Sequence, residues 1–99
     1  MTKPKAKRWT FGSIALVAAF RPKTSDARMI IGRLTGRTPE AVRLKDMGLD
    51  AARSGKKQKY GNVGNKLEPL IVKLEKKEPK LFEKIVDEIL GAAWTGHEV

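Results

Sequence analysis

The 99-residue chain contains no cysteine and only one histidine, His97. Without thiols it can form neither a disulfide framework nor a thiolate metal site. A zinc site, a Ser-His arrangement or a Cys-His arrangement needs more than one histidine near the end of the chain. We therefore expect a protein that is not an enzyme and that carries no metal or other cofactor.

The sequence also lacks an apolar run that is long enough to cross a bilayer as a helix. The longest run, Phe11–Phe20, follows a basic start and has small residues near Val17–Ala19, so it also resembles a secretory signal. The cations of Arg21–Lys23, directly after it, oppose export. We therefore predict a buried first helix in a cytoplasmic, nucleoid-associated protein without membrane contact, with secretion as the alternative.

Negative charge is scarce in the first sixty residues. Residues 1–60 contain 15 Lys and Arg against 4 Asp and Glu, whereas residues 61–99 contain 6 and 7. The net charge of +10 therefore comes entirely from the first sixty residues. This asymmetry favours a front part that binds a polyanion and a back part with another role.

Turn and cap signals divide the chain into short helices, and no alternating pattern predicts a strand. The expected fold class is all-α: a three-helix helix-turn-helix domain, then a basic glycine-rich linker, then two C-terminal amphipathic helices. The expected boundaries are a mobile basic arm at 1–8, the helix-turn-helix domain at 9–53, the linker at 54–65, the C-terminal helices at 66–94 and a tail at 95–99.

N-cap residues mark the three helix starts of the first domain. Thr10 or Ser13 can cap the first helix, Ser25 the second and Thr38 the third, in which Pro39 takes the first position. The apolar side chains expected to point inward are Met29, Ile30 and Leu34 from the second helix, and Val42, Leu44, Met47 and Leu49 from the third. The cations that alternate with those of the third helix are left to face outward.

Part of this segment resembles a known family. The sequences RWT at Arg8–Thr10, ARMIIGRLTGRTPEAVRLK at 27–45 and GL at 48–49 resemble the small Myb/SANT-like helix-turn-helix domains. In that family a Trp-Thr pair begins the first helix, and a GRTPEAV-type turn opens the third, recognition helix. The resemblance covers roughly residues 8–50, and it implies that a recognition helix near 38–49 enters the major groove of double-stranded DNA.

On this interpretation the recognition helix and its turn supply the side chains that meet DNA: Arg37, Thr38, Glu40, Arg43 and Lys45. Arg43 is expected to contact a base, because a planar guanidinium can bind bidentately. Lys45 and Arg37 are expected to contact phosphate. Further phosphate contacts are expected from the arm and the linker, through Lys5, Lys7, Arg8, Lys56, Lys57 and Lys59.

The C-terminal helices are nearly neutral and amphipathic. The last helix, from about Pro79 to Ala93, carries a wide apolar stripe made of Leu81, Phe82, Ile85, Val86, Ile89 and Leu90. The helix before it is expected to begin at Asn65, with Glu68 as a capping-box partner. One face of that helix is expected to hold Leu67, Leu70, Ile71 and Leu74. The stripe can pack onto the first three helices, or it can form the interface of a homodimer or of a complex with a partner protein.

The leading functional hypothesis is a non-enzymatic DNA-binding protein, either a small transcriptional regulator or a DNA-associated accessory factor. One alternative is a protein–protein interaction or inhibitor module whose basic front speeds encounter with an acidic surface. The other is an RNA-associated protein that uses its basic arm and linker.

Overall fold

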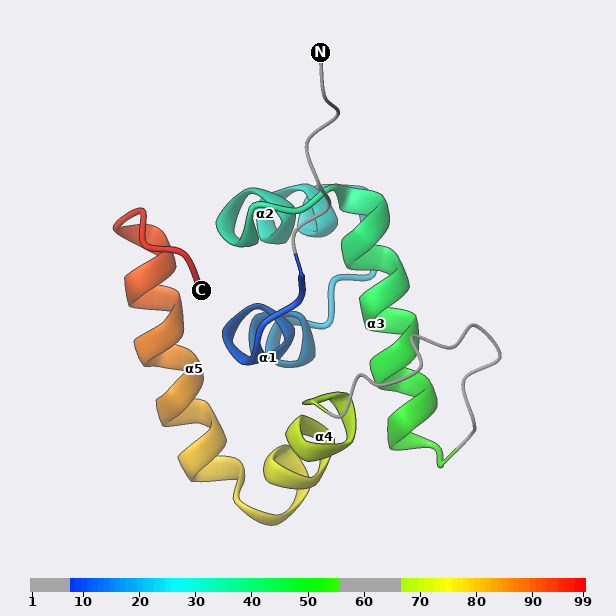
Figure 1. Ribbon diagram of the computed structural model, residues 1–99. Helices are drawn as coiled ribbons and strands as arrows, with labels where there is room; N and C mark the ends of the chain where they lie inside the picture. The colour runs from blue at the N-terminus through cyan, green and yellow to red at the C-terminus, as the bar shows by residue number, and fades with distance from the viewer. Residues whose placement is uncertain (1–7, 56–66) are drawn as a thin grey trace.

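The structure, a computed structural model, describes residues 8–55 and 67–99. These residues form five helices and no strand, which confirms the all-α prediction. The helices, shown in Figure 1, are α1 (Phe11–Phe20), α2 (Ser25–Thr35), α3 (Pro39–Arg53), α4 (Leu67–Lys77) and α5 (Pro79–Trp94). The predicted arm, except Arg8, and most of the predicted linker lie outside the described residues, and so does Asn65.

Helix α1 is the centre of the molecule, with α2, α3, α4 and α5 around it (Figure 1). Thr10 caps it, and the Ser13 hydroxyl oxygen in turn accepts a 2.9 Å bond from the Thr10 backbone N–H. The helix is apolar on every side, and all residues of 13–18 are buried. It ends where Arg21 takes a left-handed conformation, with φ of 45°, immediately before Pro22. The predicted buried first helix is confirmed.

Helices α2 and α3 are joined by a tight turn, as predicted. Gly36 ends α2 in the left-handed region at φ 72°, which glycine adopts without steric cost. Thr38 caps α3 through a 3.1 Å bond from the Ala41 backbone N–H, and Pro39 opens the helix. The cap of α2 is Thr24, one residue before the predicted Ser25.

The rotation of α2 and α3 about their axes differs from the prediction. Met29 and Ile30 are exposed, and the neighbouring Ile31 is buried in their place. In α3 the predicted inward residues Leu44 and Met47 are 54% and 51% exposed. The residues of α3 that are buried have the spacing i, i+3, i+4 and i+7 of one helical stripe. They are Val42, Lys45, Asp46 and Leu49.

The C-terminal helices complete the core of the first three. Pro79 separates α5 from α4, as predicted. Phe82 and Val86 of the predicted stripe are buried in a single apolar cluster that draws on all five helices. Leu70, expected on the inner face of α4, is exposed. The stripe therefore packs largely against its own chain, which was one of the two alternatives.

Candidate nucleic-acid interface

The outer face of α3 carries Arg43, the predicted base contact. Its guanidinium Nε donates to Glu40 Oε2 at 3.0 Å, and Nη2 forms an ion pair with Glu40 Oε1 at 2.5 Å. Nη1 also donates to Met47 Sδ at 3.3 Å. This hydrogen bonding raises the pKa of Arg43 and lowers the pKa of Glu40. The Arg43 side chain is 38% exposed and lies along the helix surface, so its planar fork already holds a carboxylate.

Arg37, in the turn before α3, is directed into the chain. Its guanidinium carbon lies over the Trp9 ring, 4.7 Å from the centroid. Nη1 donates to the Thr35 carbonyl oxygen, and Nη2 donates to the Arg8 carbonyl oxygen. Burial lowers the pKa of Arg37. Arg37 therefore connects Arg8 and Trp9, which precede α1, to the turn between α2 and α3. Only part of its guanidinium is available to a phosphate.

Lys45 does not face outward, and the prediction that it projects from the helix surface is wrong. Only 3% of the residue is exposed. Its Nζ forms an ion pair with Glu68 Oε1 of α4 at 2.6 Å, and it lies 5.4 Å from the centroid of Trp9. A phosphate contact requires an accessible ammonium, so the structure gives Lys45 a different role. It joins α3 to α4 under the Trp9 ring.

A second set of ion pairs, missed in the sequence, runs along the other end of α3. Lys23 Nζ lies 2.7 Å from Asp46 Oδ2 and 2.5 Å from Asp50 Oδ2. Arg53 pairs with Asp50 at 3.0 Å and with Glu75 of α4 at 2.6 Å. Hydrogen bonds to Asp46 and Asp50 raise the pKa of Lys23, and the bond from Lys23 lowers the pKa of Asp50. These contacts bind the C-terminal half of α3 to the α1–α2 connection and to α4.

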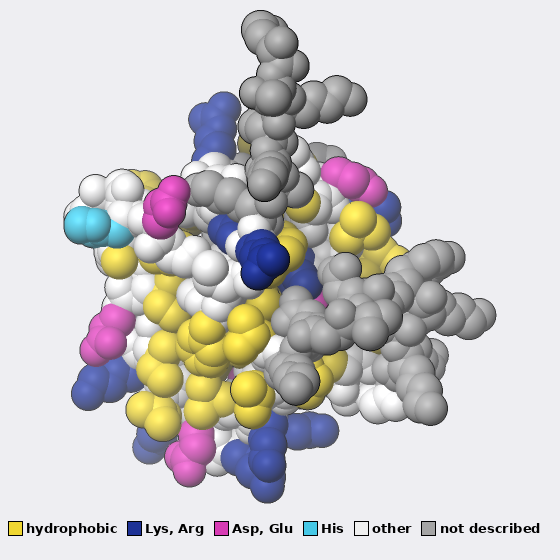
Figure 2. Space-filling view, viewed as in Figure 1, with side chains coloured by type: hydrophobic (Ala, Val, Ile, Leu, Met, Phe, Trp, Pro, Cys, Tyr) yellow, Lys and Arg dark blue, Asp and Glu magenta, His cyan; other side chains and the backbone are white. Residues whose placement is uncertain are grey.

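The cations that keep no acidic partner within the described residues of the basic front include Arg8, Arg21 and Arg33, all exposed. Lys5, Lys7, Lys56, Lys57 and Lys59 belong to segments outside the described residues, so their predicted phosphate contacts stay predictions. Thr38 uses its hydroxyl as the α3 cap. Figure 2 shows Lys and Arg side chains at the top, near the centre and along the lower edge of one face, with a hydrophobic patch between the central and the lower ones.

The predicted interface residues of α5 do not share one environment, and Leu90 is partly buried against the core. Phe82 and Val86 are core, whereas Leu81 is exposed. Ile85 and Ile89 line a shallow apolar groove of about 470 Å³ between α5 and the start of α1, with Phe11 on its other side. The groove offers few polar groups, so it lacks the convergent polar contacts of a specific small-molecule site.

Two further properties concern only the described residues. They contain no helix that is long and apolar enough to cross a membrane. They also contain no group of three or more acidic or histidine side chains placed to hold a metal ion.

In comparisons with known proteins, no family model, no curated protein and no solved structure matched the chain.

Proposed function

We propose that the protein is a non-enzymatic, double-stranded-DNA-binding protein that acts as a small transcriptional regulator or DNA-associated accessory factor. The observation that carries this proposal is how the acids of the basic front are used. Of the four acids in residues 1–60, Glu40, Asp46 and Asp50 are already held by cations of the same chain. Lys45 and Arg53 also pair with acids of α4, and the other cations of this part supply the positive charge for an external anion.

The turn between α2 and α3 supplies the proposed docking geometry. The first turn of α3 presents its positive dipole end, which suits a phosphate, while the N–H groups of Ala41 and Val42 are already bonded to Thr38. Arg43 lies one turn further on, and its bond to the exposed Glu40 is a surface ion pair of small net value. A guanine edge or a phosphate can therefore displace Glu40 from Arg43. The resemblance to Myb/SANT-like domains supports the same helix as the reader.

The test compares two variants of one ion pair, Arg43→Ala and Glu40→Gln, by fluorescence anisotropy with a labelled random duplex. Arg43→Ala should weaken binding, because it removes the cation. Glu40→Gln should strengthen binding, because it releases the same cation and removes a negative charge. Weakening by both variants, or no change in either, would contradict this use of α3. Competition by structured RNA distinguishes the RNA-associated alternative, since RNA should displace the duplex only weakly.

A second candidate function rests on the exposed apolar side chains of the same helix. Leu44 and Met47 flank Arg43 on the outer face of α3, and both are about half exposed. An apolar face edged by cations suits an acidic partner protein as well as a duplex. Leu44→Ser separates the two functions, because it should leave salt-dependent duplex binding intact and weaken a protein contact.

A further inference from the structure

The corner between α4 and α5 carries a cluster of lysines that the proposed reading of DNA does not use. Five lysines lie in the twelve residues from 73 to 84, and all are exposed: Lys73, Lys76, Lys77, Lys80 and Lys84. None of them forms an ion pair within the described residues. We refer to these five residues as the lysine corner.

The acids in the same stretch do not neutralise the lysine corner. Glu75 is held by Arg53 of α3, with 2.6 Å between Oε1 and Nε. Glu78 and Glu83 remain, and both are exposed and make no ion pair with the five lysines. Residues 73–84 therefore hold five lysines against three glutamates, inside a C-terminal part that is slightly acidic overall, and the exposed Asp87 and Glu88 follow one turn beyond Lys84.

Helix stability accounts for only some of these lysines. Lys76 and Lys77 lie in the last turn of α4, where a cation is favourable to the helix dipole. Lys80 lies in the first turn of α5, where a cation is unfavourable. That turn contains no acidic residue, and its N-cap makes no side-chain hydrogen bond. The acid nearest to this turn, Glu78 at the N-cap, forms no ion pair with Lys80, so the Lys80 ammonium is available to an external anion.

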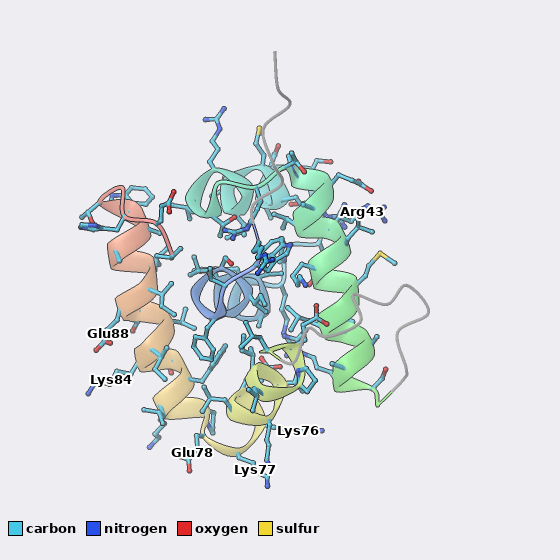
Figure 3. All side chains as sticks on the ribbon, in the orientation of Figure 1. Arg43, Lys76, Lys77, Glu78, Lys84 and Glu88 are labelled. Atoms are coloured by element: carbon cyan, nitrogen blue, oxygen red, sulfur yellow. The ribbon has the colours of Figure 1, made fainter. Side chains whose placement is uncertain are left out.

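The position of the lysine corner separates it from the α3 surface. Figure 1 places the α4–α5 turn and the α2–α3 turn at opposite ends of the molecule. In Figure 3, Lys76 and Lys77 extend outward at the α4–α5 turn, whereas Arg43 extends outward from the upper part of α3. The hydrophobic side chains in Figure 2 lie between these two ends. The lysine corner and the α2–α3 turn are thus separate basic surfaces at different ends of the molecule.

We propose that the lysine corner binds the phosphate backbone of a second duplex, so that one copy of the chain bridges two DNA segments. This inference rests on the proposed function, which supplies the first duplex. Flexible exposed lysines suit contacts with the phosphate backbone that carry no sequence information. The second contact is therefore independent of sequence and steeply dependent on salt.

The experiment measures capture of a second duplex by the full chain. One random duplex is fixed to beads, and a labelled duplex of another random sequence is added with the protein at low salt. The corner variant is Lys76→Ala/Lys77→Ala/Lys80→Ala, and the rescue variant carries arginine at the same three positions. The surface control is Arg33→Ala/Arg43→Ala on the α2–α3 side. Anisotropy with a single duplex and circular dichroism accompany each variant.

The parent and the arginine variant should capture the labelled duplex. The corner variant should capture it at least about tenfold less, while its affinity for a single duplex changes by no more than about threefold. The control should lose affinity for the single duplex. Equal capture by the corner variant and the parent would overturn the inference, and so would a parent that binds one duplex but never two. A parent that binds no duplex at low salt would overturn the proposed function as well. Bridging that disappears in Ile85→Glu, with the lysine corner intact, would assign it to self-association instead.

Discussion

Replacing Lys45 by methionine tests whether this residue stabilises the fold or contacts DNA. Methionine keeps the apolar stem and removes the ammonium that lies 2.6 Å from the Glu68 carboxylate. Both residues are almost completely buried, so the carboxylate cannot turn to bulk water in the folded state. Removing one partner of a buried ion pair costs about 3–5 kcal/mol. The contact of the ammonium with Trp9, at 5.4 Å from the ring centroid, adds to this loss.

The assay is urea unfolding followed by circular dichroism at neutral pH. Lys45→Met should lose about 3–5 kcal/mol, a large share of the free energy of unfolding of a small domain, which is about 5–15 kcal/mol. Lys45→Met/Glu68→Leu should recover most of that loss, because apolar replacements of whole buried pairs are often neutral or stabilising. Arg43→Met, two residues earlier on the exposed face of α3, is the matched control and should unfold at the same urea concentration as the parent.

The same variants should separate when they bind a duplex. Under conditions in which Lys45→Met is folded, its duplex affinity should equal that of the parent, whereas Arg43→Met should bind more weakly. If Lys45→Met unfolds like the parent and loses salt-dependent duplex binding, its ammonium is a phosphate contact and the reasoning from burial is refuted.

Three further predictions use other parts of the structure. Gly32→Ala places a Cβ 2.6 Å from the Arg37 carbonyl oxygen, so it should lower the free energy of unfolding by about 1–3 kcal/mol, measured by thermal unfolding. The control Gly91→Ala meets nothing within 4 Å and should not destabilise the fold. Equal melting temperatures of the two variants would contradict this reasoning. The pKa of Asp50 lies below its ordinary 3.8 in the folded state, so its pair with Lys23 stabilises the fold above that pH and the stabilisation is lost as the pH falls through the folded pKa. Lys23→Met should therefore make acid unfolding less steep, and an unchanged acid limb would count against the pair. Because Phe82 and Val86 of the α5 stripe are buried in the chain's own core, sedimentation across a concentration series should show a monomeric parent, and self-association that Ile85→Glu weakens would contradict this and restore the predicted α5 interface.

Local chemistry in the sequence predicted where the helices begin. Thr38 followed by Pro39 marks the start of α3 because a capping hydroxyl and a fixed φ act within a few residues. Thr10 and Pro79 mark α1 and α5 in the same way. These signals depend on the backbone nearby, so they could be read without knowing how the helices pack.

The buried face of each helix could not be predicted from local sequence signals alone. Met29, Ile30 and Ile31 are consecutive apolar residues, and a rotation of one residue decides which of them enters the core. Lys45 is buried only because Glu68, 23 positions later, supplies its partner. The spacing of Val42, Lys45 and Leu49 was a usable signal, but it required accepting a buried lysine before its acid was known.

The most direct test of the central claim, that duplex DNA docks on the α2–α3 side through α3, is a titration of the ¹⁵N-labelled full chain with a short random duplex, followed by amide NMR shifts. At low salt and up to one duplex per chain, we predict that the largest shift changes lie in residues 33–43 and include Arg43, and that they fade as salt is raised. A duplex that binds while these amides stay unchanged, with the shift changes confined to α4 and α5, would contradict the account.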